Sequence, residues 1–222
     1  MEPIAFIETP FKEKFGVPRQ SLLVEEAWGK LEFVKNDFNL EAFRGIDEFT
    51  HLWLIFSFHR AIDEGVKALV RPPRFAGSEK WGVYATRSPH RPNHLGLSVV
   101  KFKKLEVTKD KINLWVDGVD LVSGTPILDI KPYISYSDSI IEANSGVFHQ
   151  SPEFKKVKWN KAQDLDSNLK TLIEKVIALD PRPSFDQDQS FGVSVSGYNV
   201  RFHLEGDEFI IDSLEECDIS KR

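Results

Sequence analysis

The chain has 222 residues, a formal net charge of −5 and 41% hydrophobic residues, which fits one large globular domain or a domain with a small annex. No apolar run approaches the roughly 20 residues of a membrane-spanning helix, and Met1-Glu2-Pro3 is not the cationic start of a signal peptide. Cys217 is the only cysteine, which excludes a disulfide framework and a thiol metal cluster and favours a reducing, cytoplasmic location.

Charge is distributed unevenly along the chain. Residues 60–104 hold ten Lys or Arg against three Asp or Glu, whereas residues 205–222 hold seven acids against two bases. An acidic protein can present one basic face, and such a face could steer RNA. The alternative is that these charges scatter over a solvated surface, and the sequence does not separate the two.

The first sixty residues predict short strands joined by loops and a helical turn. Gly16 and Pro18 constrain the loop over residues 11–20, which ends in the hydrogen-bond donors Arg19 and Gln20. A helical turn or two is expected over residues 40–49. The run Leu-Trp-Leu-Ile-Phe-Ser-Phe suits a strand covered on both faces, and it ends in the polar pair His59-Arg60. The predicted strands span residues 3–8, 29–34 and 52–58.

Residues 61–78 form a basic, Pro-rich segment with the run Arg71-Pro72-Pro73-Arg74. We expect a mobile loop here, with a helical turn near residues 63–69. Basic loops beside a site can close over a substrate. A disordered insertion is an equally good interpretation.

The stretch from Arg87 to Ser98 contains two prolines and a glycine, which favour an irregular, stiff loop that leads into a strand. Arg87 and Arg91 place two planar cations on this loop, suited to a carboxylate or phosphate. Solvated arginines on a tight connection would explain the same pattern. The clearest predicted hairpin follows, with strands over residues 95–107 and 111–117 and a turn at Lys109-Asp110.

Two segments after the hairpin carry polar side chains. In Asp117-Gly118-Val119-Asp120, the glycine would allow a ligand to approach the backbone closely, although Asp-Gly also marks ordinary turns. On the strand predicted over residues 126–133, Asp129, Lys131 and Tyr133 alternate and so share one face. That face could line a pocket or meet solvent.

The C-terminal part predicts a small α+β domain after a boundary in residues 137–151. Apolar residues at helix spacing run from Leu165 to Ile177, with Asp166 or Asp164 as the N-cap and Asp180-Pro181 as the stop. The acidic tail, residues 215–218, is expected to be mobile. Short strands are predicted over residues 193–195, 200–204 and 208–211.

Five ordered motifs resemble those of the TsaA-like, or TrmO (YaeB), family. They are Phe15-Gly16-Val17-Pro18-Arg19-Gln20, Phe49-x-His51-Leu52-Trp53, Arg87-Ser88-Pro89-x-Arg91-Pro92-Asn93-x-x-Gly96-Leu97-Ser98, Gly118-Val119-Asp120-Leu121-x-x-Gly124-Thr125-Pro126 and Leu128-Asp129-Ile130-Lys131-Pro132-Tyr133. The resemblance runs from about Ile4 to Tyr136 and continues more weakly to Asp180-Pro181-Arg182-Pro183. It implies a mainly β fold, a single-sheet β-barrel over residues 1–140, here followed by the α+β domain over residues 151–222.

The resemblance also implies an activity, namely S-adenosylmethionine-dependent methylation of the exocyclic amine of threonylcarbamoyl-adenosine beside the tRNA anticodon. It implies a homodimer as well. The residues expected to contact the cofactor are Pro18, Arg19, Gln20, His59, Arg60, Arg87, Leu97, Asp117, Gly118, Val119 and Asp120. We assign substrate contacts to Arg91, Asn93 and Tyr136, and catalysis to Asp129, Lys131 and Tyr133.

Familiar alternatives lack their motifs. There is no Gly-x-Gly-x-x-Gly turn and no Walker loop. His90 and His94 have a metal-ligand spacing, but Pro92 excludes a helical pair and no further cluster joins them, so no metal is expected. A barrel that binds S-adenosylmethionine or another nucleotide without turnover, and a methyltransferase for a non-RNA substrate, stay as alternatives.

Overall fold

A computed structural model describes residues 1–34, 40–71, 79–109, 111–182 and 190–217. The chain forms two compact units. The first comprises Met1–Ile7, Lys30–Val116 and Gly124–Ser151, and the second comprises Glu8–Gly29, Asp117–Ser123 and Pro152–Arg222. None of the helices in the described ranges is long and apolar enough to cross a membrane.

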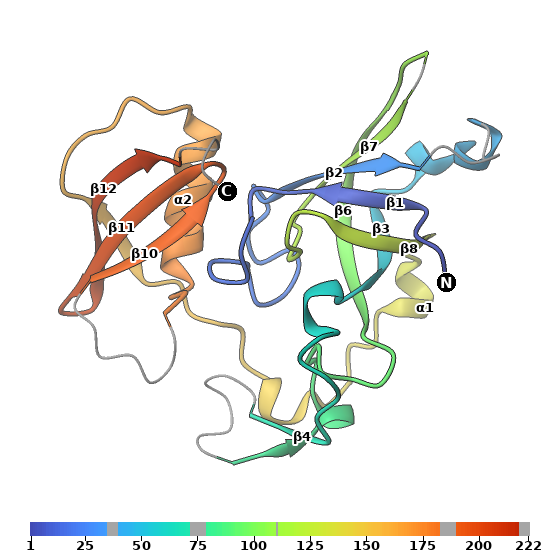
Figure 1. The fold of residues 1–222 in the computed structure, drawn as a ribbon, viewed down its shortest axis with the longest axis horizontal. Helices are drawn as coiled ribbons and strands as arrows, with labels where there is room; N and C mark the ends of the chain where they lie inside the picture. Colours follow the sequence, from blue (N-terminus) through green and yellow to red (C-terminus); the bar gives the residue numbers. More distant parts are fainter. Residues whose placement is uncertain (35–39, 72–78, 110, 183–189, 218–222) are drawn as a thin grey trace. The chain divides into compact units, whose positions relative to one another are not determined.

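Six strands close into a barrel in the order β1-β2-β7-β6-β3-β8 (Figure 1). Closure comes from β1 and β8, which pair antiparallel with Ala5 opposite Ile127. The predicted mainly β barrel is therefore confirmed, including its β6–β7 hairpin. The six strands are β1 (Ala5–Glu8), β2 (Trp28–Phe33), β3 (His51–Ser57), β6 (Leu95–Val107), β7 (Ile112–Asp117) and β8 (Thr125–Pro132).

The barrel core follows from the two-residue period of its strands. On β3, Leu52, Leu54 and Phe56 are buried, while the alternate residues Trp53 and Ile55 are half-buried. The expectation that both faces of this strand are covered holds fully for the inner face and partly for the outer one. Other buried barrel residues are Ala5, Ile7, Leu31, Val100, Leu114, Val116 and Ile127.

Short elements complete the first unit. The helical turns expected over residues 40–49 are η1 (Leu40–Phe43) and η2 (Ile46–Glu48). The turn expected near residues 63–69 is present only at its start, where the Gly65 amide donates to the Ile62 carbonyl at 3.1 Å. A 3-10 turn precedes it at η3 (His59–Ala61), and Leu69 pairs in a strand with Gly82. Part of that basic segment, residues 72–78, and Asp110 of the hairpin turn lie outside the described residues. The remaining elements are β4 (Leu69–Val70), β5 (Trp81–Gly82), η4 (Val83–Ala85), α1 (Ser135–Asp138) and η5 (Gly146–Phe148).

The second unit contains a four-stranded sheet, in the order β10-β11-β12-β9, and one longer helix, α2 (Ser167–Ala178). Asp166 caps α2 by accepting the amides of Asn168 at 2.9 Å and Leu169 at 3.2 Å. Leu172, Ile173, Val176 and Ile177 form its buried stripe. The strands are β9 (Lys156–Trp159), β10 (Ser190–Val195), β11 (Tyr198–Glu205) and β12 (Glu208–Glu216).

Two features of this sheet differ from expectation. The short strand β9 was not predicted, and it pairs parallel with β12 through the register Phe209 to Val157. The acidic tail was expected to be mobile, yet Glu215 and Glu216 pair with Asn199 and Tyr198 on β11. Backbone pairing is indifferent to side-chain charge on an exposed face, so the acidic composition did not reveal the strand. Asp218 lies outside the described residues.

Candidate functional site

The loop from Arg87 to Asn93 is held by its own side chains. Arg91 donates from Nη1 to the carbonyls of Thr86 and Ser88, both at 3.2 Å. The imidazole Nδ1 of His94 lies 3.1 Å from the Pro89 carbonyl. Arg91 therefore shapes the loop that carries it, while Arg87 and Asn93 are exposed.

Backbone hydrogen bonds bring η3 beside this loop. The Phe58 amide donates to the His94 carbonyl at 2.7 Å, and the Lys67 amide donates to the His90 carbonyl at 3.0 Å. His59 and Arg60 follow Phe58 directly. Two of the sequence motifs, the end of β3 and the Arg87 loop, are thus adjacent in the first unit, as a shared site requires.

The predicted catalytic residues lie on the outer face of the barrel. Ile55 on β3 pairs with Leu97 on one side and with Asp129 on the other. Lys131 pairs with Trp53 in the same way, and the Tyr133 ring lies 5.8 Å from the Trp53 ring. Asp129 and Lys131 are exposed, and Leu97 is 54% exposed. The prediction that the three residues share one face is confirmed by this register.

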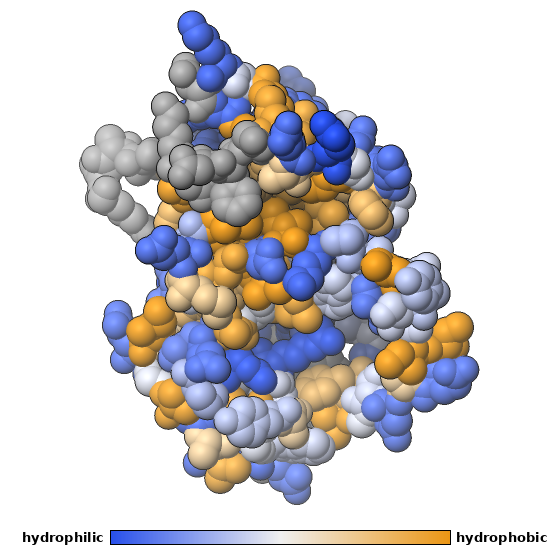
Figure 2. Space-filling model, turned by 90° about the vertical axis from the view of Figure 1, so that its right-hand side faces the viewer, coloured by the Kyte–Doolittle hydropathy of each residue, from blue (hydrophilic) through white to orange (hydrophobic). Residues whose placement is uncertain are grey.

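Tyr136 stands apart from this packing. Its side chain is 90% exposed on α1, and Ile140 and Ile141 beyond it are also exposed. Figure 2 shows other hydrophobic residues, in orange, lying among hydrophilic ones on one face of the molecule. An exposed ring can stack on a base, because every base has an apolar face.

In the second unit, the segment that follows the Phe15–Gln20 motif packs against the Gly118 motif. The Leu22 amide donates to the Gly118 carbonyl at 2.8 Å, and the Val119 amide donates to the Ala27 carbonyl at 2.9 Å. Gly118 has a φ of 78°, and a Cβ there would lie 2.6 Å from Cδ2 of Leu22. We expected this glycine to let a ligand approach the backbone closely. In the structure, the close neighbour of Gly118 is the side chain of Leu22, from the same unit.

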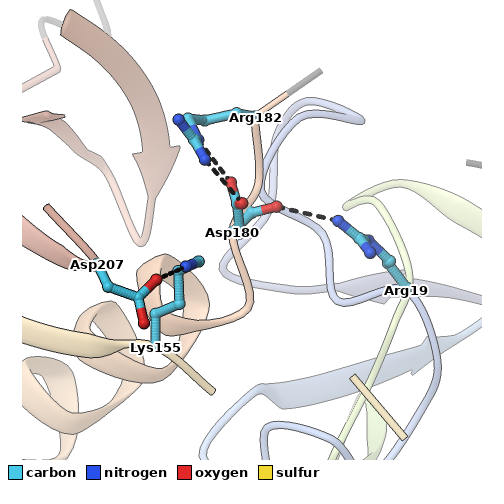
Figure 3. Close-up of polar contacts among 5 residues, drawn as sticks. All are labelled: Arg19, Lys155, Asp180, Arg182 and Asp207. Atoms are coloured by element: carbon cyan, nitrogen blue, oxygen red, sulfur yellow. Dashed lines mark hydrogen bonds and ion pairs between the residues drawn. The ribbon is translucent and has the colours of Figure 1, made fainter. Parts of the chain in front are cut away.

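Arg19 is held by a residue that sequence reasoning did not assign to the site. Its Nη2 donates to the backbone carbonyl of Asp180 at 3.0 Å, across 161 residues (Figure 3). The Asp180 carboxylate in turn pairs with Arg182. In the sequence, Asp180-Pro181 indicated the end of a helix and a weak continuation of the family match, but no local pattern shows which loop a carbonyl will meet.

The predicted residues therefore fall into two groups, each described within its own unit. His59, Arg60, Arg87, Arg91, Asn93, Leu97, Asp129, Lys131, Tyr133 and Tyr136 belong to the first, and Pro18, Arg19, Gln20, Asp117, Gly118, Val119 and Asp120 to the second. Within the described residues, no group of three or more His, Cys, Asp or Glu side chains could hold a metal ion.

Comparisons with known proteins identify two family models along the chain. The tRNA-methyltransferase O N-terminal domain matches residues 6–139, and the TrmO C-terminal domain matches residues 150–217. The tRNA (adenine(37)-N6)-methyltransferase of Escherichia coli K12 is 36% identical over 228 residues, covering 96% of this chain and 97% of that protein.

Two other relatives extend the comparison. A Pseudomonas aeruginosa protein with S-adenosylmethionine-dependent methyltransferase in its name is 37% identical, covering 95% of this chain and 94% of its own. A crystal structure of TrmO superposes with a TM-score of 0.78 at 33% identity, covering 96% of this chain and 97% of the other. Because both domain families match in order, this chain belongs to the TrmO family of tRNA methyltransferases.

Proposed function

We propose that this chain is an S-adenosylmethionine-dependent tRNA (adenine(37)-N6)-methyltransferase that converts threonylcarbamoyl-adenosine to its N6-methyl form. The observation that carries the proposal is its similarity to the E. coli enzyme of that name over nearly the whole of both chains. The substrate base lies in the anticodon loop, and the basic segment of residues 60–104 offers cations for the RNA backbone. We place the enzyme in the cytoplasm, where it would meet tRNA.

The polar side chains suit the cofactor. S-adenosylmethionine has a carboxylate, an ammonium and a ribose diol, and it supplies the methyl group when bound. Arg19 and Gln20 offer donors to a carboxylate, and Asp117 offers an acceptor to an ammonium or a ribose. The bonds that tie Leu22 to Gly118 fix the two segments relative to each other within their unit. Pro18, Val119 and Asp120 lie on the same two segments, and we propose that they contact the cofactor as well.

In the first unit, we propose that His59, Arg60, Arg87 and Leu97 also contact the cofactor. Their setting supports this role, because the hydrogen bond from Phe58 to His94 keeps η3 beside the Arg87 loop. Arg87 is exposed, and a guanidinium matches a carboxylate with two parallel hydrogen bonds.

For the reaction, the protein must place the substrate amine and accept its proton. Holding reactants in line lowers the barrier by about 7–11 kcal/mol at best. Asp129 is our candidate proton acceptor. Its side chain is exposed, and it lies on β8, separated from Leu97 on β6 by the strand β3. Lys131 and Arg91 would recognise the threonylcarbamoyl carboxylate, Tyr133 would orient the base, and Asn93 and Tyr136 would contact the substrate nucleoside.

We propose a homodimer and two domains, residues 1–140 and 151–222. Support for the dimer comes from the outer barrel face, where Leu97 is 54% exposed and Trp53, Ile55 and Val99 are only half-buried. A second copy would cover this apolar surface, which a monomer would leave in water, and would complete the site beside Leu97 and Asp129. Sedimentation velocity should then give twice the monomer mass for the wild type. The Val99→Glu variant should give the mass of a monomer.

The central experiment is nucleoside mass spectrometry after incubation with S-adenosylmethionine and two tRNA pools. One pool carries threonylcarbamoyl-adenosine and the other lacks it. We expect a gain of one methyl on the modified nucleoside alone. Tight cofactor binding with no gain in either pool would contradict the proposal and favour a non-catalytic barrel or a non-RNA substrate.

A further inference from the structure

Asp180 contacts two arginines with different parts of one residue (Figure 3). Its carboxylate accepts Nε of Arg182 at 2.7 Å and Nη2 at 3.0 Å, which is a two-point pairing. Its backbone carbonyl accepts Nη2 of Arg19 at 3.0 Å. All three residues belong to the second unit.

The carbonyl of Asp180 is aimed by an uncommon backbone conformation. Asp180 has a φ of 53°, in the left-handed region, and is only 5% exposed. Aspartate and asparagine tolerate this region better than other non-glycine residues. Its amide donates to the Ile177 carbonyl at 2.9 Å at the end of α2. The left-handed backbone of Asp180 is therefore held in two ways, by its amide at the end of α2 and by its carboxylate on Arg182.

Arg182 is anchored in turn by the sheet. Its guanidinium carbon lies 5.5 Å from the ring centre of Phe191 on β10 and 5.1 Å from that of Phe209 on β12. Phe209 is fully buried. The hydrogen bonds that Arg182 donates to the Asp180 carboxylate raise the pKa of Arg182. The contacts form a series from the sheet through Arg182 and Asp180 to Arg19.

We propose that Asp180 and Arg182 are positioning residues that orient the Arg19 guanidinium for the cofactor. A long arginine samples many rotamers, and a carbonyl bond at one nitrogen restricts the direction of the whole planar group. The C-terminal sheet then sets cofactor affinity through Arg19. This role depends on the proposed function, in which Arg19 contacts S-adenosylmethionine.

The test is calorimetric titration of S-adenosylmethionine into the full chain and its variants. Asp180→Asn keeps the size and the tolerance of a left-handed φ but removes the charge that pairs with Arg182. We expect it to weaken binding about 5- to 20-fold, as coupled neighbours do. In the Arg19→Ala background it should change nothing further. Arg182→Lys keeps the charge without the planar fork and should give an intermediate loss.

Asp207→Asn is the matched control. It removes the ion pair between Asp207 and Lys155 in the same unit. Of the hydrogen bonds and ion pairs drawn in Figure 3, none joins this pair to Arg19. The affinity of this variant for S-adenosylmethionine should equal that of the wild type. Thermal melting of every variant separates lost affinity from lost folding, and Arg182→Lys carries the test should Asp180→Asn fail to fold.

Two results would overturn the inference while the proposed function stands. One is wild-type affinity in Asp180→Asn and Arg182→Lys when Arg19→Ala binds weakly. The other is an equal loss from Asp180→Asn with and without Arg19, since its effect would then bypass that side chain. A wild-type protein that binds no S-adenosylmethionine would instead contradict the proposed function itself.

Discussion

The indole nitrogen of Trp53 donates a hydrogen bond of 2.9 Å to the carboxylate of Asp138, which lies 85 residues further along the chain. The same oxygen accepts the amide of Ile134 at 2.9 Å. Together they tie α1 to the outer face of β3. The Ile134 amide first, and the Trp53 indole second, lower the pKa of Asp138 because both stabilise the charged carboxylate.

Acid should loosen this contact. A carboxyl whose pKa is lower in the folded than in the unfolded chain stabilises the fold above its unfolded pKa, and that contribution is lost as the pH falls through the folded pKa. We therefore expect the contact to be intact at neutral pH and to weaken below about pH 4. The Trp53 indole N–H resonance, followed by NMR during acid titration, should shift in that range.

Asp138→Asn provides the comparison for this titration. The variant should show a displaced indole resonance already at neutral pH and no titration in the acid range. Asp47→Asn, on η2, should titrate like the wild type. An unchanged acid shift in Asp138→Asn would show that another group titrates beside Trp53.

Gly96 should not tolerate a side chain. A Cβ at this position would lie 2.3 Å from two ring carbons of Phe56, which is 3% exposed. We expect Gly96→Ala to reduce the free energy of unfolding by about 1–3 kcal/mol, because the ring is confined by the barrel core. Denaturant unfolding measures the change, and adding Phe56→Leu should recover part of it.

Gly82→Ala is the control for Gly96→Ala. Among the described residues, no heavy atom beyond the two chain neighbours of Gly82 lies within 4 Å of a Cβ placed there, and its φ of −58° suits any residue. Stability should stay equal or rise by about 0.4–1 kcal/mol, because alanine restricts the unfolded chain. Equal stability losses in both variants would mean that Phe56 does not decide the cost.

Asp129→Asn should slow methyl transfer without weakening cofactor binding. Loss of a proton acceptor typically costs about 10²–10⁴ in rate. Single-turnover methylation of modified tRNA measures the rate, and calorimetry measures the affinity for S-adenosylmethionine. Asp47→Asn should keep both values. Full activity in Asp129→Asn would exclude this residue from proton transfer.

Arg87→Ala should act on the cofactor instead. Removing a charged hydrogen-bond donor from a carboxylate costs about 10- to 100-fold in affinity. The dissociation constant of S-adenosylmethionine should rise by that factor, with an unchanged melting temperature, because the Arg87 side chain is exposed. Arg44→Ala, another exposed arginine, should bind normally. Unchanged affinity in Arg87→Ala would remove it from the cofactor contacts.

Much of the local structure was readable in the sequence. Alternation predicted the β6–β7 hairpin, and apolar spacing with Asp166 predicted α2, because these elements depend on neighbours within a few residues. Alternation also placed Asp129, Lys131 and Tyr133 on one face. The ordered motifs indicated the family, and the family models confirm it.

Tertiary structure decided what depends on distant partners. Closure of β1 on β8, the parallel pairing of β9 with β12 and the contact of Arg19 with Asp180 join segments far apart in the chain. Backbone amides and carbonyls are the same in every residue, so no sequence pattern states which distant strand or loop they will meet. For that reason the sequence placed Asp180 at a helix end and in the weaker part of the family match, but did not show that it holds an arginine of the candidate site.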